Sequence, residues 1–321
     1  MLSSDQYLDI IENAIENIDY PAHPSGLYQP IKYALETGGK RIRPMLTLAA
    51  CEALGVDVNV AVDQALAIEM FHNFTLLHDD VMDKAEVRRG RPTVHQRWNE
   101  QTAILSGDAM LTMSQMMASR CAVEKLPSVL ALFNKTAMEV YEGQQYDMDF
   151  EHRKSVSAEN YMEMIRLKTS VLIGCAVRMG ALMAGADENT QQAFYDYGEK
   201  LGLAFQLRDD FLDTFGDPTI FGKAIGGDIV NDKKTWLLIT AMSEDRSGTI
   251  EKWLGNQSDK SGKIEAVTGV YRFLKLDERC SELVNRYCDE AVAQLNRISS
   301  LSVETREFFV ELAMKSRARS N

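Results

Sequence analysis

The segment "LALFNKTAMEVY", residues 130–141, decides the fold class of this chain. Its apolar residues recur at intervals of three and four, which is the spacing of one face of an α-helix. A β-strand would instead alternate apolar and polar residues with a period of two. The segment therefore predicts an amphipathic helix with a buried face made of Leu130, Phe133, Ala137, Val140 and Tyr141.

The same spacing returns further along the chain, and proline does not interrupt it. Residues 161–172 form a second stripe with this spacing, and Lys168 is its one charged member. No proline occurs from Ser128 to Asp217 or after Pro218. Because a proline inside a helix removes a backbone hydrogen bond, both stretches permit long helices. Segments with strand-like alternation are almost absent, so we predict an all-α fold. The apolar members of the second stripe are Tyr161, Met164, Ile165, Val171 and Leu172.

Proline also predicts where helices break. The segment "DYPAHPSGLYQP", residues 19–30, holds three prolines and predicts a gap between helices. None of the predicted breaks has the composition of a flexible linker, so we expect a single domain over residues 1–321. A chain of 321 residues is also long enough for two domains, which is the alternative.

Charge and composition exclude some partners. A net charge of -12 argues against nucleic acid or an anionic membrane surface as the main partner. An anionic substrate would need metal ions or clustered Lys and Arg. The apolar run "SVLIGCAVRMGALMAGA" is too short to span a bilayer, and the first residues lack the regions of a signal peptide. The five cysteines show no CxxC pair and predict buried thiols. We therefore expect a cytoplasmic protein without membrane insertion.

Two acidic motifs with the same spacing carry the chemistry. "HDDVMDKAEVRRGRP" (residues 78–92) and "FQLRDDFLDTFGD" (residues 205–217) each contain DDxxD within apolar surroundings. On a helix, the first and last acids of such a motif share a face, where like charges repel. A divalent cation would offset this repulsion, and oxygen ligands select magnesium or manganese. A solvated helix face explains one copy but not two. The acids are Asp79, Asp80 and Asp83, then Asp209, Asp210 and Asp213.

Basic residues follow each motif and also form a group near the N-terminus. Arginine forks and lysine ammonium groups are the side chains that bind phosphate oxygens. The segment "GGKRIRP" places its cations on a turn made by Gly38 and Gly39, although a basic helix start is the alternative for this segment alone. It matches no nucleotide-binding fingerprint. The cations are Lys40, Arg41, Arg43, Arg88, Arg89, Arg91, Lys223, Lys233 and Lys234.

Taken together, these segments resemble the trans-isoprenyl diphosphate synthases, the polyprenyl synthetase family. Seven segments occur in the family's order over nearly the whole chain: "GGKRIRP", "LLHDDVMDKAEVRRGRPTVH", "GDAML", "YEGQQYD", "LKTS", "GLAFQLRDDFLD" and "FGKAIGGDIVNDKKT". The resemblance implies long, mostly antiparallel helices around a central cavity, and a homodimer. It also implies elongation of an allylic diphosphate (dimethylallyl, geranyl or farnesyl) by isopentenyl diphosphate, with release of pyrophosphate.

The resemblance also implies a role for each matching residue. Three magnesium ions, with manganese as a substitute, would be held by Asp79, Asp83 and Asp209, supported by Asp80 and Asp213. The allylic diphosphate would be bound by Arg88, Lys168, Lys223 and Lys233. The isopentenyl diphosphate would be bound by Lys40, Arg43, His72 and Arg89. Thr169 and Gln206 would place oxygen dipoles near the reacting carbons. Gln144 and Asp147 would lie in the next layer of residues and support them.

Residues one turn before Asp79 would form the floor of the cavity and limit product length. Phe74 lies five residues before Asp79 and Thr75 four before it. One aromatic ring with a threonine resembles the geranylgeranyl type, and the farnesyl product is the alternative. His78 is expected to make a hydrogen bond to another helix rather than bind a metal.

Two other functions fit parts of the pattern. A class I terpene cyclase also has an aspartate-rich motif, but it normally lacks the second DDxxD and the "GGKRIRP" segment. A non-catalytic prenyltransferase subunit would be expected to carry degraded acidic motifs, and both motifs are intact here.

Overall fold

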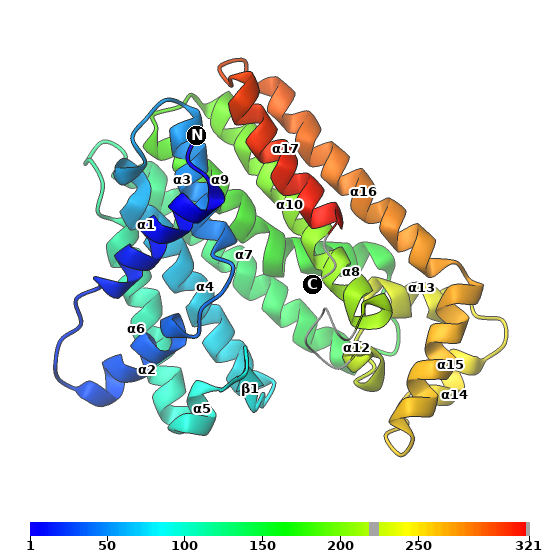
Figure 1. Ribbon diagram of the computed structural model, residues 1–321. Coiled ribbons are helices and arrows are strands. Elements are labelled where there is room, and N and C mark those ends of the chain that lie inside the picture. The colour runs from blue at the N-terminus through cyan, green and yellow to red at the C-terminus, as the bar shows by residue number, and fades with distance from the viewer. Residues whose placement is uncertain (218–224, 319–321) are drawn as a thin grey trace. The chain divides into compact units, whose positions relative to one another are not determined.

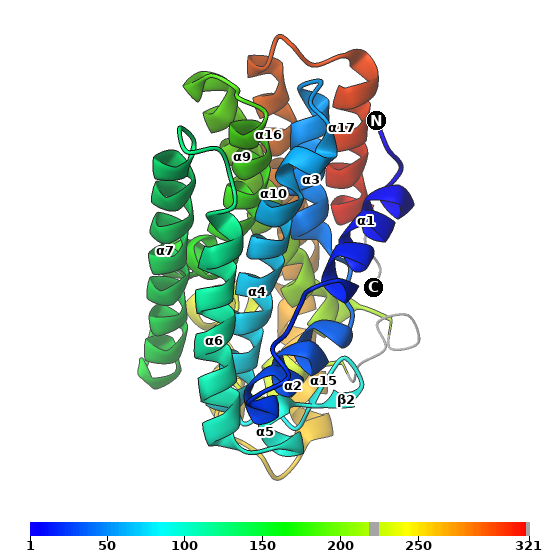
Figure 2. The same ribbon diagram turned by 90° about the vertical axis from the view of Figure 1, so that its left-hand side faces the viewer.

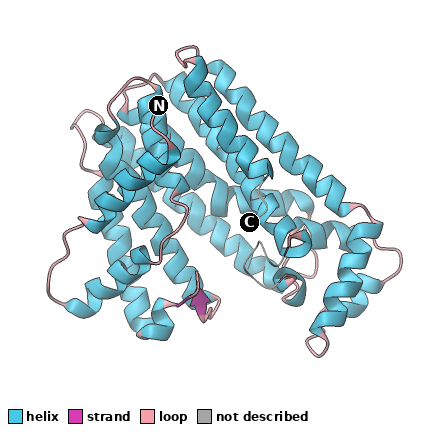
Figure 3. Ribbon diagram, viewed as in Figure 1, coloured by secondary structure: helices cyan, strands magenta, loops and turns pink. Residues whose placement is uncertain are grey.

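The computed structural model describes residues 1–217 and 225–318, and in these ranges nearly all regular structure is helical (Figures 1 and 3). The one pair of strands is the short hairpin β1 (Val87–Arg88) and β2 (Arg91–Pro92), paired antiparallel. The prediction of an all-α fold is confirmed. The chain divides into two compact units, which are described separately. The N-terminal unit comprises Met1–Lys135 and Cys175–Phe194, and the C-terminal unit comprises Thr136–Gly174 and the residues from Tyr195 on.

The N-terminal unit is built mainly from its first helices. They are α1 (Ser4–Glu16), α2 (Ser25–Glu36), α3 (Ile42–Ala53), α4 (Val62–Met82), α5 (Val94–Arg97) and α6 (Glu100–Ala118), with a 3-10 turn at Val58–Ala61. Helices α4 and α6 lie side by side (Figure 2). Almost every side chain of α3 is buried, because this helix is apolar on all sides and can only lie in the core.

The C-terminal unit contains the later helices. They are α8 (Ala158–Ile165), α12 (Gly227–Val230), α13 (Trp236–Glu244), α14 (Thr249–Trp253), α15 (Lys260–Phe273), α16 (Leu276–Gln294) and α17 (Val303–Ala318), with a 3-10 turn at Leu295–Arg297. Helices α16 and α17 pack along each other (Figure 1). The boundary between the units falls inside α7 (Leu126–His152), α9 (Val171–Met183) and α10 (Glu188–Phe215).

Both apolar stripes lie on buried helix faces. In the first, Phe133, Ala137 and Val140 are buried, and all five apolar members of the second are buried. The second stripe is not one regular α-helix, because Arg166–Ser170 form a π-helical turn between α8 and α9. This turn inserts an extra residue where the sequence predicts continuous spacing.

The predicted break at residues 19–30 is wrong in its second half. Helix α2 begins at Ser25, directly after Pro24, and it contains Pro30. Pro30 lies in the middle of α2 and costs the helix a backbone hydrogen bond, a loss that burial of Pro30 with Ile31 helps to offset. The cysteines agree with the prediction: all five are free thiols, and four are buried. No helix among the described residues is long and apolar enough to cross a membrane.

Helix α9 approaches α3 so closely within the N-terminal unit that residue 180 must be glycine. A Cβ at Gly180 would overlap the Thr47 carbonyl oxygen and lie 2.9 Å from the Ala50 Cβ. This clash involves backbone atoms, which cannot move aside as the end of a flexible side chain can. We therefore expect Gly180→Ala to lower the free energy of unfolding by about 1–3 kcal/mol or more.

Gly26→Ala is the matched control, because nothing lies within 4 Å of a Cβ at Gly26 in α2. We expect its free energy of unfolding to change by less than about 1 kcal/mol. Denaturant unfolding of both variants measures the difference, and equal stability of the two would contradict the close approach of α9 to α3.

Candidate functional site

The first acidic motif lies at the C-terminal end of α4. The Asp83 amide donates to the Asp79 carbonyl over 2.8 Å, so these two residues stand one helical turn apart, as predicted. A helix carries partial negative charge at its C-terminal end, and carboxylates there are unfavourable. The last turn of α4 has no basic residue to offset them. The position therefore favours a cation beside these acids.

The middle acid of this motif has a different environment. Asp80 is buried, and both of its oxygens accept from Arg88 Nε at 2.8 Å. Arg88 Nη2 lies 2.7 Å from Asp80 and 3.7 Å from Asp79. Burial raises the pKa of Asp80, although Arg88 opposes the rise. Asp80 thus holds the arginine that follows it in the hairpin.

Cationic groups gather around His72 in the N-terminal unit. Arg43 Nη1 lies 3.3 Å from His72 Nε2. Because arginine only donates hydrogen bonds, Nε2 must be the acceptor and the ring proton lies on Nδ1. Desolvation, then the charges of Arg43 and Arg89, hold the pKa of His72 well below its usual range. His72 therefore stays neutral, and the surrounding arginines create a local positive potential in an acidic protein.

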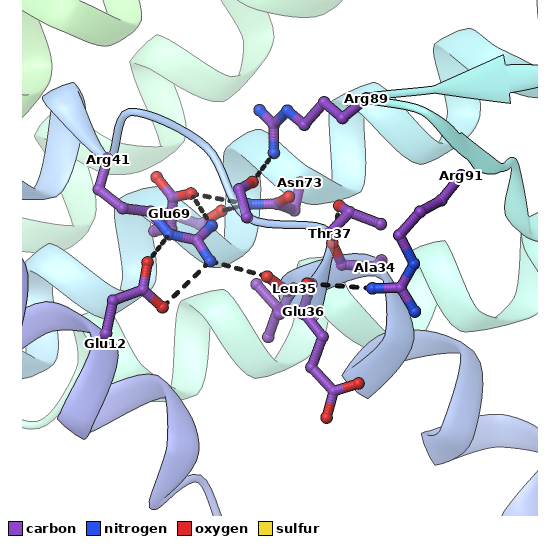
Figure 4. Close-up of polar contacts among 11 residues, drawn as sticks. Glu12, Ala34, Leu35, Glu36, Thr37, Arg41, Glu69, Asn73, Arg89 and Arg91 are labelled. Atoms are coloured by element: carbon purple, nitrogen blue, oxygen red, sulfur yellow. Dashed lines mark hydrogen bonds and ion pairs between the residues drawn. The ribbon is translucent and has the colours of Figure 1, made fainter.

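The "GGKRIRP" segment forms the loop between α2 and α3. Gly38 and Gly39 have positive φ angles of 73° and 148°, so the predicted glycine turn is present. Lys40 is exposed in this loop. Arg89 donates to the Gly38 carbonyl from the hairpin, as Figure 4 shows.

Arg41 does not lie where its place in this basic segment suggests. It points into the protein, is 3% exposed, and is paired with Glu12 and Glu69. The interpretation of Arg41 as a phosphate-binding cation is therefore wrong.

The second acidic motif lies in the last two turns of α10, which also lack a basic residue in the final turn. Its middle acid, Asp210, is 3% exposed and accepts from the Tyr161 hydroxyl and from Gln206 Nε2 at 3.1 Å. Burial, and secondly the charge of Asp228, raise the pKa of Asp210 to about 7. In both motifs, then, the middle acid is buried and held by side chains. The sequence identified Asp210 as an acid of the motif and Tyr161 as a member of an apolar stripe, but it did not predict the hydrogen bond between them.

A hydrogen-bond chain continues from Asp210 to the "LKTS" segment. Thr169 Oγ1 donates to Gln206 Oε1 over 3.2 Å. Since the Gln206 amide group donates to Asp210, its carbonyl oxygen must face Thr169. The single hydroxyl hydrogen of Thr169 is used in this bond, which leaves the lone pairs of its oxygen directed elsewhere.

Lys168 and Thr169 lie in the π-helical turn, a feature frequent at functional sites. Lys168 Nζ is 2.6 Å from Asp147 on α7, and the supporting role expected for Asp147 stays a prediction. Glycines allow two helices to approach the turn. A Cβ at Gly143 on α7 would overlap the Lys168 amide nitrogen, and a Cβ at Gly202 on α10 would lie 2.6 Å from Ser170 Cα. These close approaches hold the turn in place.

The third acid of the second motif contacts the segment after α10. Asp213 Oδ2 accepts from the Asp228 backbone amide at 2.9 Å, and Lys233 Nζ lies 3.8 Å from Asp228 Oδ1. Lys223 lies outside the described residues. Within residues 1–217 and 225–318, no three Asp, Glu, His or Cys side chains are grouped closely enough to hold a metal ion.

The predicted floor residues lie on α4. Phe74 is buried, with its ring centroid 5.5 Å from that of Phe71 and 4.8 Å from that of His78. Thr75 donates to the His72 carbonyl at 2.8 Å. His78 Nε2 lies 3.1 Å from the Ile104 carbonyl of α6, which confirms its expected hydrogen bond to another helix.

The predicted residues thus form two groups, one in each unit. Asp79, Asp83 and the cations around His72 belong to the N-terminal unit; Asp209, Asp213, Lys168, Thr169, Gln206 and Lys233 belong to the C-terminal unit. Joint action of the two groups on one ligand stays a prediction, as does a single domain over residues 1–321.

Comparisons with known proteins match nearly the whole chain. The polyprenyl synthetase family model matches residues 24–271. A geranylgeranyl diphosphate synthase of Methanosarcina mazei is 38% identical over 236 residues, which is 73% of each chain. One of Sulfolobus acidocaldarius is 34% identical over 93% of each chain. A crystal structure of a geranylgeranyl pyrophosphate synthase has a TM-score of 0.93 and 39% identity over the full length of both chains. The resemblance predicted from the sequence is confirmed, and this chain belongs to the polyprenyl synthetase family.

Proposed function

We propose that this protein condenses an allylic diphosphate with isopentenyl diphosphate to give geranylgeranyl diphosphate and pyrophosphate. Prenyl diphosphate chain elongation follows from membership of the family. The observation that carries the proposal is the repeated arrangement of the two DDxxD motifs. Each lies at a helix C-terminus, and in each the middle acid is buried and held by side chains, Asp80 by Arg88 and Asp210 by Tyr161 and Gln206.

The donor set fits magnesium ions that are shared with the substrate. Magnesium is usually bound by one or two carboxylates together with substrate phosphates and water, rather than by a complete protein cage. Asp79, Asp83 and Asp209 would hold three such ions, supported by Asp80 and Asp213. Manganese offers similar chemistry with the same oxygen ligands. When bound, the ions would neutralise the charge that develops on the departing diphosphate.

Protein cations would bind and orient the two diphosphates. Arg88, Lys168 and Lys233, with Lys223, would bind the allylic diphosphate. Lys40, Arg43 and Arg89 would bind the isopentenyl diphosphate. The neutral ring of His72 would add a hydrogen bond, because its Nδ1–H can donate to a phosphate oxygen.

Oxygen dipoles would stabilise the positive charge on the reacting allylic carbon. The hydroxyl hydrogen of Thr169 is donated to Gln206, so the lone pairs of Thr169 can face an electron-poor centre. Removal of water is needed because the allylic cation would otherwise react with it. The released pyrophosphate is our candidate for the base that takes the final proton.

Product length is proposed from the residues before Asp79. Phe74 is buried one turn before the acids and is held between Phe71 and His78. A ring fixed in this way would stop a growing chain, whereas Thr75 is too small to do so earlier. This arrangement supports a twenty-carbon product, and a fifteen-carbon farnesyl product is the alternative.

We also propose a cytoplasmic homodimer. Helix α6 exposes Ile104, Leu105 and Met116, whose exposed fractions are 47%, 61% and 59%. Leu105 and Met116 are eleven residues apart, or three helical turns, and therefore share one face. An apolar face of this kind fits a second copy of the chain. The free cysteines support a reducing compartment.

Incubation with magnesium, dimethylallyl diphosphate and isopentenyl diphosphate tests the proposal. We expect all-trans prenyl diphosphates that end at twenty carbons, resolved by chromatography after dephosphorylation. A cyclic hydrocarbon from a single diphosphate would instead indicate a terpene cyclase. No product at all would indicate a non-catalytic subunit, and either result would overturn the proposal.

Asp79→Ala tests the metal assignment. We expect turnover to fall at least about 100-fold, because charge stabilisation at the leaving group is lost. The fold should be retained, since Asp79 is only half-buried and its removal relieves repulsion at the helix end. Asp9→Ala removes an exposed carboxylate of α1 as a control and should leave turnover unchanged. Near-normal turnover of Asp79→Ala would disprove the assignment.

Phe74→Ala tests the floor. We expect longer products than those of the unsubstituted protein, because loss of the ring opens space below the acids. Phe309→Ala in the C-terminal unit also removes a buried ring and serves as the matched control, with product length unchanged. Chromatography of the prenyl alcohols measures both, and an unchanged length for Phe74→Ala would refute the floor assignment.

A further inference from the structure

The loop between α2 and α3 has a backbone that only specific contacts can hold. Gly38, Gly39 and Arg41 all have positive φ angles, of 73°, 148° and 45°. For arginine this conformation costs free energy, because its Cβ crowds the backbone. Arg41 is also the N-cap residue of α3, and the Met45 amide donates to its carbonyl at 3.1 Å. Something must compensate for this conformation.

The side chain of Arg41 supplies the compensation. Its Nε donates to Glu12 over 2.8 Å, its Nη1 to Glu69 over 2.7 Å, and its Nη2 to the Leu35 carbonyl over 2.7 Å (Figure 4). Glu69 is itself buried and accepts from Asn73 at 3.0 Å. The guanidinium therefore joins three separate elements: α1, the end of α2, and α4.

A pocket borders the loop on the side of α1. A cavity of about 420 Å³ lies there, lined by residues that include Glu12, Tyr20, Lys32, Gly38 and Arg41. Next to such a space, a loop lacks the dense contacts that fix a core segment. On this side the hydrogen bonds of Arg41 tie the loop to α1, α2 and α4.

On its other side, the loop contacts the guanidinium of Arg89. The Gly38 carbonyl accepts a hydrogen bond from Arg89 Nη1. A Cβ at Gly39 would lie 2.9 Å from the same nitrogen, so the guanidinium lies directly against the glycine backbone. Arg91 donates in a similar way to the Glu36 carbonyl at 3.1 Å. A shift of the loop would therefore move Arg89.

Arg41 also links the loop to the helix that carries His72. Its partner Glu69 lies one turn before His72 on α4, and Arg43 reaches the same histidine. A guanidinium neutralised by two carboxylates has little attraction left for a phosphate. Its effect must therefore act through its neighbours.

We propose that Arg41 and Glu69 are positioning residues for the second diphosphate. Their buried ion pair sets the loop so that Lys40, Arg43 and Arg89 match the spacing of one diphosphate beside His72. The inference rests on the proposed function, in which these cations bind isopentenyl diphosphate. It assigns to Arg41, a residue in the middle of a phosphate-binding segment, a role without phosphate contact.

The double variant Arg41→Leu with Glu69→Leu separates positioning from stability. Removing only the arginine would leave the buried charge of Glu69, whereas replacing a buried ion pair by apolar groups is often neutral for stability. Glu12, the other carboxylate, is partly exposed to water and stays in place. We expect the thermal unfolding of the double variant to stay close to that of the unsubstituted protein. The KM for isopentenyl diphosphate should rise about 10-fold, while the KM for the allylic diphosphate should change less than about twofold.

Arg41→Lys provides a second variant that keeps the charge. A lysine can pair with Glu69 but cannot reach two carboxylates and the Leu35 carbonyl in one geometry. We expect the same selective rise in the KM for isopentenyl diphosphate. Arg178→Lys is the matched control, because Arg178 belongs to the same unit and bonds Glu188 and Gln192 rather than the loop. Both of its KM values should be unchanged.

The outcomes separate the two proposals. If the unsubstituted protein elongates and neither Arg41 variant alters the ratio of the two KM values, the inference is overturned and the proposed function stands. A parallel rise of both KM values together with a lower unfolding temperature would show a merely structural role and would also overturn it. If the unsubstituted protein makes no prenyl product, the proposed function falls and the inference falls with it.

Discussion

Negative charge at the C-terminal ends of two helices is the constraint around which this structure is arranged. Helices α4 and α10 both carry three aspartates at or near the C-terminal end, where the helix dipole disfavours them, and neither final turn has a basic residue. The protein partly offsets this cost with its own groups. Arg88 holds Asp80, Tyr161 and Gln206 hold Asp210, and the Asp228 amide bonds Asp213. The outer acids of each motif keep their place on one helix face, where divalent cations and a diphosphate would complete the balance.

A chain with a net charge of -12 must also bind anions, and it does so by giving its arginines different tasks. The guanidinium of Arg41 is paired with Glu12 and Glu69, and in our proposal it positions the loop. Arg43 and Arg89 surround His72, whose pKa is held well below its usual range by desolvation and then by these charges, so this part of the N-terminal unit is locally positive. Sequence proximity does not reveal this division, because Arg41 and Arg43 are only two residues apart. Arg41 combines a positive φ angle with a buried side chain paired to two glutamates, and these contacts are distant in sequence.

The helices and the acids could be predicted from the sequence because their signals are local. The apolar spacing of residues 130–141 needs only a 3.6-residue period, and the DDxxD pairs need only one helical turn. The failures involve contacts distant in sequence or small changes of geometry. The π-helical turn at Arg166–Ser170 depends on Gly143 and Gly202 of two other helices. The partnership of Asp210 with Tyr161 spans 49 residues. Pro30 is accepted inside α2 because burial compensates for a lost bond, which spacing alone does not show.

The proposal that the aspartates and a diphosphate bind the same metal ions has a direct test. Manganese binding should be measured by titration calorimetry with and without inorganic pyrophosphate, using the full-length protein. Since ions of this kind are usually held by one or two carboxylates together with substrate phosphates, we expect weak binding of manganese alone and much tighter binding once pyrophosphate is present, with this gain lost in Asp79→Ala. Equally tight manganese binding without pyrophosphate, or a gain that survives Asp79→Ala, would contradict this view of the acidic motifs.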